Sequence, residues 1–356
     1  MKKTAIAAIL TILFCSSGNG QNNSTGDFFV FEPDIRLFTS YAFMNAAGYS
    51  HDWNATMHPI RVEVRNYLDS TLTDSYRTQI HQYYDKLGGG DFYGYGIYAI
   101  NSNFPPEFGL ICDTCRIEGL ERFENYDSIL ADFYKTAQIE RLWKRYYKKL
   151  RDINLQYEPF AEIAIQHITS YCRTDTDYFR NHANGKFYYQ QIPLMSHFTA
   201  FFNEAGTDYW VVSGPTAGEP DPSAFYHEPL HKIINPIVES NESVTKRLEI
   251  LVELSQQRLK GDYNNIIYLV CESFVRAIDR VLYARYNNLT ATELHQIMED
   301  EYRQRHILTF YLLENLPEYE ASGKTLKAYY PQLISNIDLE REKARWNDYW
   351  KNNKDK

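Results

Sequence analysis

The period of the apolar residues changes twice along this 356-residue chain, and that change restricts the fold more than any other feature. Apolar residues recur every three or four positions over residues 35–87 and 118–172, as on one face of a helix. Residues 186–213 instead hold short aromatic and β-branched runs that are typical of strands. The helical period returns near Ser223. The pattern predicts an α+β fold, mostly helical, with a small antiparallel sheet before the helix that begins near Ser223.

Four short segments are expected to form the sheet. Phe28 to Phe31 is an apolar run that can add one strand. Lys186–Met195, Phe198–Glu204 and Asp208–Ser213 are rich in aromatic and β-branched residues. The last two flank Gly206, which suits the turn of a hairpin.

Glycine and proline mark the ends of the helical stretches. Pro59 predicts a break in the first stretch, and Gly88–Gly90 ends it. Residues 91–117 are expected to be rich in loops. Gly214–Pro222 reads as a further loop, after which Ser223 is the expected N-cap of the next helix.

The N-terminus has the organisation of a secretory signal peptide. Lys2 and Lys3 provide a positive start, and Ala5 to Phe14 is an apolar stretch too short to span a bilayer. Small residues predict cleavage after Gly20. A lipid anchor on Cys15 is the alternative, although the bulky residue before it is unusual at such a site. In either case we expect export, to the periplasm, the extracellular space or the cell surface.

The chain is therefore divided into four parts. Residues 1–20 are the signal peptide, and the polar residues 21–27 form a flexible linker. Residues 28–180 form a mainly helical N-terminal region. Residues 181–350 form the region that carries the chemistry, because the strands and the motif described below lie within it.

Composition excludes two classes of protein. The chain has 37 Lys and Arg against 46 Asp and Glu, a net charge of −9, whereas nucleic-acid binding needs clustered basic residues. The mean hydropathy of −0.50 excludes a membrane protein with several spans. We therefore expect neither a nucleic-acid partner nor a membrane span.

Four cysteines remain after the signal peptide: Cys112, Cys115, Cys172 and Cys271. The first two are separated by two residues and can close a local disulfide in an oxidising compartment, or act as a redox pair. A structural zinc site needs a second pair at similar spacing, and the sequence has none.

The residues with the clearest chemical meaning form an H-E-x-x-H motif at the start of a predicted helix. His227 and His231 are four residues apart, so both imidazoles can face one metal ion. Glu228 lies about 100° further round the helix axis, where it can border the metal without binding it. From there it can take a proton from a water molecule that the metal activates. This is the minimum equipment for hydrolysing a peptide bond.

Pro229 lies between the two histidines and is unusual inside a helix. Proline removes one backbone hydrogen bond and clashes with the preceding turn, at a cost of about 3 kcal/mol. The helix is therefore either kinked between the histidines or starts later than Ser223. A misaligned motif would leave a binding protein without catalysis.

A catalytic zinc ion needs a third protein ligand and an open position, and Glu272 is the expected third ligand. It lies in a strongly apolar helix, where an unpaired carboxylate is expensive. Arg276, four residues on, is the alternative partner for this carboxylate. Asp279 is placed to orient a ligand histidine.

Other residues compete for roles at this site. Glu239 is eight residues after His231 and so near the same helix face, but Pro236 is expected to end or bend that helix first. Tyr268, one turn before Glu272, is a candidate for stabilising an oxyanion. Further competing third ligands are Glu242, Glu249 and Asp262.

The sequence from His227 to His231, the following Ile234-Asn235-Pro236-Ile237-Val238, and the later segment from Glu272 to Ile278 together resemble the DUF4932 family. That family comprises secreted proteins typical of Bacteroidetes with a gluzincin-type HExxH site. The resemblance implies a zincin-like metallopeptidase fold over residues 181–350, with Zn²⁺ held by His227, His231 and Glu272. It also implies that Glu228 is the catalytic residue.

The sequence thus supports three hypotheses. The first is an exported zinc metallopeptidase that hydrolyses a peptide or protein substrate, with the hairpin strand at Tyr209–Ser213 lining the cleft. The second is an inactive zincin-like binding module, in which Pro229 distorts the site. The third is a helical scaffold in which the motif is accidental. They differ in whether the three side chains at residues 227, 231 and 272 converge on one point.

Overall fold

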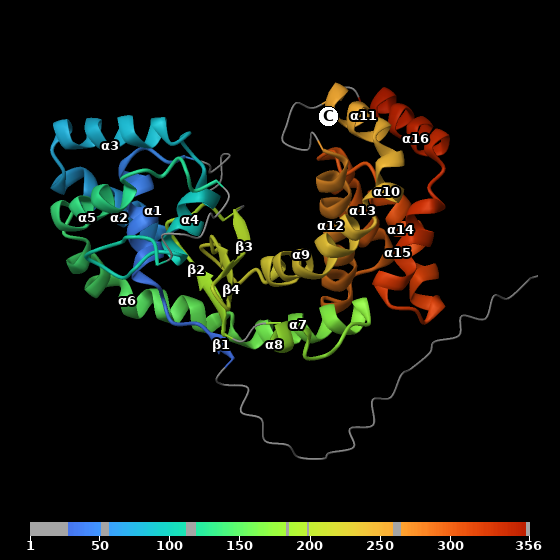
Figure 1. The fold of residues 1–356 in the computed structure, drawn as a ribbon, viewed down its shortest axis with the longest axis horizontal. Helices are drawn as coiled ribbons and strands as arrows, with labels where there is room; N and C mark the ends of the chain where they lie inside the picture. The colour runs from blue at the N-terminus through green and yellow to red at the C-terminus, as the bar shows by residue number, and fades with distance from the viewer. Residues whose placement is uncertain are drawn as a thin grey trace, which may run out of the picture.

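A computed structural model shows two helical lobes on either side of a small sheet (Figure 1). The signal peptide, the linker, Cys112, Cys115 and Asp262 lie outside the described part of the chain. Within that part, none of the helices is both long and apolar enough to cross a membrane. The described residues are 28–50, 57–111, 119–182, 185–197, 199–258 and 265–353.

The first lobe is a bundle of helices around an aromatic core. Its helices are α1 (Ile35–Ala46), α2 (Pro59–Thr71), α3 (Asp74–Lys86), α4 (Phe92–Ile100), α5 (Tyr126–Thr136) and α6 (Ile139–Gln156). Asp34, Thr73 and Asp91 each accept a backbone N–H at a helix start, which explains where α1, α3 and α4 begin. Pro59 is the first residue of α2, where its missing N–H removes no helical bond, so the predicted break is confirmed.

Helix α4 corrects the expectation that residues 91–117 are rich in loops throughout. The expectation rested on Pro105-Pro106 and the two cysteines further along, whereas residues 92–100 form a helix in spite of two glycines that lower its intrinsic propensity. Tertiary packing explains one of them, because a Cβ at Gly96 would overlap the ring of Phe201 from the sheet. The glycine therefore lets the helix approach the sheet closely, and that contact lies far away in the sequence.

The sheet is mixed, which corrects the expected antiparallel arrangement. Its strands are β1 (Phe29–Val30), β2 (Phe187–Gln191), β3 (Ala200–Ala205) and β4 (Asp208–Ser213), in the spatial order β1-β2-β4-β3. Only β3 and β4 pair antiparallel, as the predicted hairpin around Gly206, whereas β1–β2 and β2–β4 are parallel. Parallel neighbours need a long crossover connection, and most of the first lobe provides it between β1 and β2. Strand β3 lies at one edge of the sheet.

The two faces of the sheet belong to two different cores. Successive side chains of a strand point to opposite faces, so Trp210 and Val212 pack into the first lobe. Tyr209 and Val211 join the second core instead. That second core also includes Tyr157 and other residues that precede position 180. The sheet is therefore the layer that holds the lobes together.

The second core is built on helices α7 to α16. Thr290 and Glu293 form the predicted capping box at the start of α13. The helices are α7 (Glu158–Cys172), α8 (Tyr178–His182), α9 (Ser223–Ser240), α10 (Glu242–Thr245), α11 (Ile250–Arg258), α12 (Ile266–Tyr286), α13 (Ala291–Arg303), α14 (Thr309–Ser322), α15 (Leu326–Ser335) and α16 (Leu339–Asn352), with a 3-10 turn over Lys246–Leu248.

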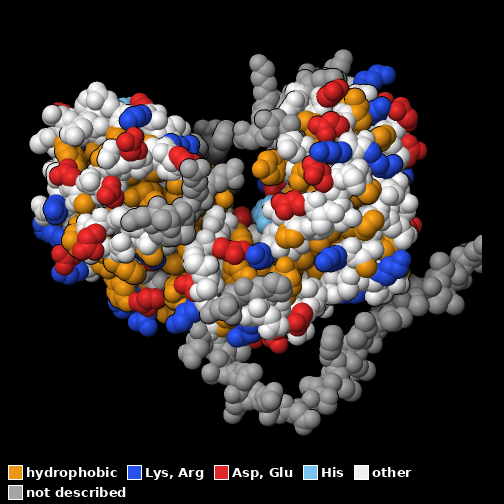
Figure 2. Space-filling view, viewed as in Figure 1, with side chains coloured by type: hydrophobic (Ala, Val, Ile, Leu, Met, Phe, Trp, Pro, Cys, Tyr) orange, Lys and Arg blue, Asp and Glu red, His pale blue; other side chains and the backbone are white. Residues whose placement is uncertain are grey.

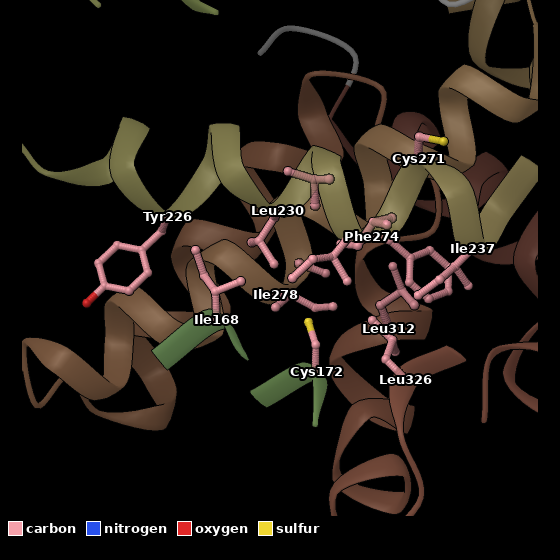
Figure 3. Close-up of a cluster of buried hydrophobic side chains, with 14 of the residues drawn as sticks. Ile168, Cys172, Tyr226, Leu230, Ile237, Cys271, Phe274, Ile278, Leu312 and Leu326 are labelled. Carbon is pink, nitrogen blue, oxygen red and sulfur yellow. The ribbon is translucent and has the colours of Figure 1, made fainter. Parts of the chain in front are cut away.

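Helices α9 and α12 pack directly against each other at the centre of this lobe. Figure 3 shows Leu230 of α9 and Phe274 and Ile278 of α12 meeting in one apolar cluster above Cys172 of α7. The helical period expected along α12 is confirmed by its buried face. This packing brings the polar residues on the remaining faces of α9 and α12 to a common edge.

Candidate metal centre

Helix α9 carries the H-E-x-x-H motif and begins where the sequence predicted, but with a different cap. The helix starts at Ser223 with Pro222 at the cap position, and the Asp221 carboxylate accepts the N–H of Ser223 at 2.9 Å. Ser223 is therefore the first helical residue and not the N-cap. The cap geometry comes from the loop before it, whose conformation the local sequence does not specify.

Both prolines of α9 lie inside one continuous helix. The helix runs from Ser223 to Ser240, so it does not end at Pro236 as one of the two expectations had it. Because Pro236 lacks an N–H, the carbonyl of Lys232 loses its helical partner. The Tyr178 hydroxyl, from α8, donates to that carbonyl at 3.3 Å. A tertiary contact thus compensates part of the cost of a proline in the helix.

The three predicted ligands converge on one point. The Nε2 atoms of His227 and His231 lie 3.3 Å apart, despite Pro229 between them. Glu272 Oε1 lies 3.6 Å from His227 Nε2, and its Oε2 lies 3.5 Å from His231 Nε2. Around a tetrahedral ion with bonds of about 2.0–2.1 Å, ligand atoms lie about 3.3–3.4 Å apart. The group can therefore hold a metal ion.

The other ring nitrogen of each histidine faces an oxygen. Asp279 Oδ2 lies 3.4 Å from His227 Nδ1, in the orienting position that the sequence predicted. Asn235 Oδ1 lies 3.2 Å from His231 Nδ1. Oxygen acceptors at Nδ1 hold the proton there and leave Nε2 with its lone pair, as a metal requires. Sequence reasoning missed Asn235, although its i,i+4 spacing from His231 was a usable signal.

Glu228 borders the same point and is only 8% exposed. Burial raises the pKa of its carboxyl to about 7, although the nearby His227 opposes the shift. A carboxyl with a pKa near neutrality can both accept and release a proton, which suits acid–base chemistry. Glu228 lines the same cleft as the two histidines, and its role beside a metal stays a prediction.

Glu272 is tied to a charge network that the sequence revealed only in part. Arg276 Nε donates to Glu272 Oε1 at 2.5 Å, so the predicted alternative partner is present together with the histidines. Burial opposes ionisation of Glu272, but His227 and Arg276 hold its pKa well below the usual range. Glu301, on α13, accepts from Arg276 and from Arg280. No local pattern pointed to Glu301, because it comes from another helix.

The carboxyl groups of this cluster outnumber its guanidinium groups. Two guanidinium groups face four carboxyl groups, all of them buried or nearly so. A buried charge is expensive unless an opposite charge neutralises it. In spite of burial, Glu272 and Asp279 raise the pKa of His227, so the cluster favours positive charge at this point, and a divalent cation there would supply it. The cluster comprises Arg276, Arg280, Glu228, Glu272, Asp279 and Glu301.

The cluster opens into a large cleft between the lobes. Figure 2 shows histidine side chains on the wall of the hollow that separates them. The cavity has a volume of about 1720 Å³, and Phe201 and Phe202 of β3 line one side. Arg280 of α12 and Gln304, just beyond α13, line the opposite side.

The remaining predicted residues do not join this group. Glu239 lines the cleft but is not among the three convergent residues, and Tyr268 is 61% exposed and does not line the cavity. Glu242 and Glu249 are not part of the group in the described chain. His306 is buried, and its Nε2 lies 3.9 Å from Glu301 Oε2.

Comparisons with known proteins provide no relative for this chain. No family model, curated protein or solved structure matches it. The resemblance to the DUF4932 family therefore rests on the quoted residues alone. The assignments that follow depend on the geometry of the site.

Proposed function

We propose that this protein is an exported zinc metallopeptidase with a gluzincin-like ligand set. His227, His231 and Glu272 would hold Zn²⁺, and Glu228 would act as general base. The observation that carries the proposal is the convergence of the three residues: one ligand atom from each lies within 4.8 Å of the others, and a buried carboxyl group lines the same cleft. Membership of the DUF4932 family, a zincin-like fold and export through residues 1–20 are parts of the same proposal.

The donor set favours zinc in a catalytic role. Two imidazoles and one carboxylate are typical zinc ligands, and three protein ligands leave a position open, whereas structural zinc sites usually have four. When bound, zinc lowers the pKa of a coordinated water molecule and polarises a carbonyl group. The surplus of buried carboxylates around the site favours a divalent cation for the same electrostatic reason.

Residues of the protein would carry out proton transfer and orient the metal ligands. Glu228 is positioned to accept a proton from the attacking water and to pass it to the leaving amine. Asp279 and Asn235 keep the two imidazoles turned toward the ion.

A peptide is the proposed substrate class because the edge strand of the sheet lines the cleft. Ser213 of β4, the strand predicted to line the cleft, does line it, but β4 lies between β2 and β3 and so has no edge left for a peptide. Strand β3 is the edge strand, and several of its residues line the cavity. An extended peptide can add to such an edge through main-chain hydrogen bonds. The proposed substrate is therefore an extended segment of a peptide or protein.

The competing hypothesis is a binding module in which Pro229 misaligns the histidines. The 3.3 Å separation of the two Nε2 atoms argues against that misalignment. An accidental motif in a helical scaffold would not explain why a third, distant carboxylate and an orienting Asp279 meet it.

The test is zinc content and peptide hydrolysis of the mature protein from Gln21 onward. We expect about one zinc per chain by elemental analysis, and cleavage of an unfolded protein substrate followed by mass spectrometry. Glu272→Ala should lose the metal, whereas Glu228→Gln should keep it and lose cleavage. A metal-free wild type after dialysis against zinc would reject the proposal. Zinc binding without cleavage of any unfolded substrate would favour the binding module.

A further inference from the structure

The two oxygens of Glu272 have different surroundings. Oε1 accepts the Nε–H of Arg276 at 2.5 Å and lies 3.6 Å from His227 Nε2, whereas Oε2 faces only His231 Nε2 among these groups, at 3.5 Å. Glu272 and Arg276 are one turn apart on α12, so the helix itself holds the guanidinium over Oε1. Only one of the two oxygens is clear of a strong charge-assisted hydrogen bond.

Glu301 fixes that arrangement from the neighbouring helix. Its Oε2 accepts from Arg276 Nη1 at 2.9 Å, and its Oε1 accepts from Arg280 Nε at 2.8 Å. Glu301 is only 3% exposed, so water hardly competes for these contacts. The carboxylate therefore anchors Arg276 from the side away from Glu272.

The consequence concerns the number of positions at the metal. A carboxylate with both oxygens available can bind an ion through both, which would occupy the position that a catalytic site keeps for water. A guanidinium anchored over one oxygen opposes this binding mode, by its hydrogen bond and by its positive charge close to the cation.

We propose that Arg276 is a positioning residue that reserves Glu272 Oε1, so that the metal centre keeps a position open to water. Glu301 acts through Arg276 and holds it in place. This inference rests on the proposed function, because it assumes that Glu272 is a ligand.

The experiment uses Co²⁺ as the probe, bound to the mature protein after removal of other metals. Cobalt in a four-coordinate site absorbs visible light more strongly than in a five-coordinate site, so the spectrum reports the coordination number. The test variants are Arg276→Met and Arg276→Gln, and the second keeps a polar partner for Glu301 in case the first does not fold. Arg280→Met is the matched control, because it removes the same charge and one partner of Glu301 but leaves Oε1 covered.

We expect wild type and Arg280→Met to give the strong absorption of a four-coordinate ion. Both Arg276 variants should absorb more weakly per bound cobalt and should bind it more tightly, since Glu272 gains a second free oxygen. A partner that only orients its ligand behaves oppositely, and its loss weakens metal binding by about 10–100-fold. Unchanged spectra, or weaker binding in both Arg276 variants, would overturn the inference while leaving the proposed function intact. If the wild-type protein binds no cobalt, both the inference and the proposed function are rejected.

Discussion

Both lobes contain arginines paired with buried carboxylates, Arg36 in the first lobe and Arg276 and Arg280 in the second. The ratio of carboxylates to arginines differs between the two. In the first lobe, Arg36 is 5% exposed and pairs with Asp34, with Nη2 2.7 Å from Oδ2. Its remaining donors meet the carbonyls of Ile100 and Ser102, and its guanidinium lies 4.5 Å from the ring centroid of Phe104. One guanidinium thus meets one carboxylate in a well-bonded pair.

In the second lobe, the arginines of the cleft are surrounded by more carboxyl groups than there are guanidinium groups. Arg276 and Arg280 share Glu301, and the former also contacts Glu272. Glu228 lies in the same cleft with its pKa raised by burial. Arg36 and Asp34 match one to one, whereas in this cluster the carboxyl groups outnumber the guanidinium groups. Buried negative charge without enough positive charge nearby lowers the stability of the fold. Such a cluster therefore indicates a site that binds a cation.

The largest expected change in stability comes from breaking the pair between Asp34 and Arg36. Asp34→Ala removes the partner of buried Arg36 and the cap of α1, and we expect a loss of about 3–5 kcal/mol in the free energy of unfolding. Urea unfolding measures it, with Asp34→Asn as a control that keeps a capping side chain. A loss of less than about 1 kcal/mol would mean that this pair is not structural.

The second largest change in stability is expected when zinc is added to the cluster around Glu272. Zinc at 100 times its dissociation constant should stabilise the wild type by about 2.7 kcal/mol, and a chelator should reverse this. Thermal unfolding with and without zinc measures the shift. Glu272→Ala should show no shift, whereas Asp34→Asn should respond as wild type does. An equal response of Glu272→Ala would place the zinc elsewhere.

A smaller change in stability is expected when the carboxyl group of Glu228 is removed. In metal-free protein, Glu228→Gln should raise the free energy of unfolding by about 0.5–2 kcal/mol, because it abolishes a buried charge kept for function. Denaturant unfolding at neutral pH in the presence of chelator measures this. The comparison between the lobes fails if the substitution destabilises the metal-free protein.

The smallest effect concerns Glu342, a buried carboxylate of α16 outside both networks. Burial raises its pKa above the usual value, although Arg345, 3.2 Å away, opposes the shift. A raised pKa in the folded state favours the protonated form, so stability is full at low pH and falls as the pH rises through that pKa.

Glu342→Gln should therefore gain about 0.5 kcal/mol at pH 7 and nothing at pH 4. Unfolding curves at the two pH values provide the measurement. A gain of equal size at both would mean that the effect is packing and not charge.

Patterns of short range predicted much of this protein. The i,i+4 spacing of His227 and His231 was enough to bring both imidazoles to one point, because a helix places such residues on one face. The apolar period of α12 and the capping box at Thr290 are equally local, and both are confirmed. Glu272 was found because a carboxylate stands out in an apolar helix.

Contacts between distant segments decided the rest. The parallel pairing of β1 with β2, the edge position of β3 and the helix at α4 depend on residues far apart in sequence, which periodicity does not detect. Glu301 reaches the site only because α13 packs on α12. A sequence states which face of each element is apolar, whereas the partner of each polar face is settled only when all elements pack together.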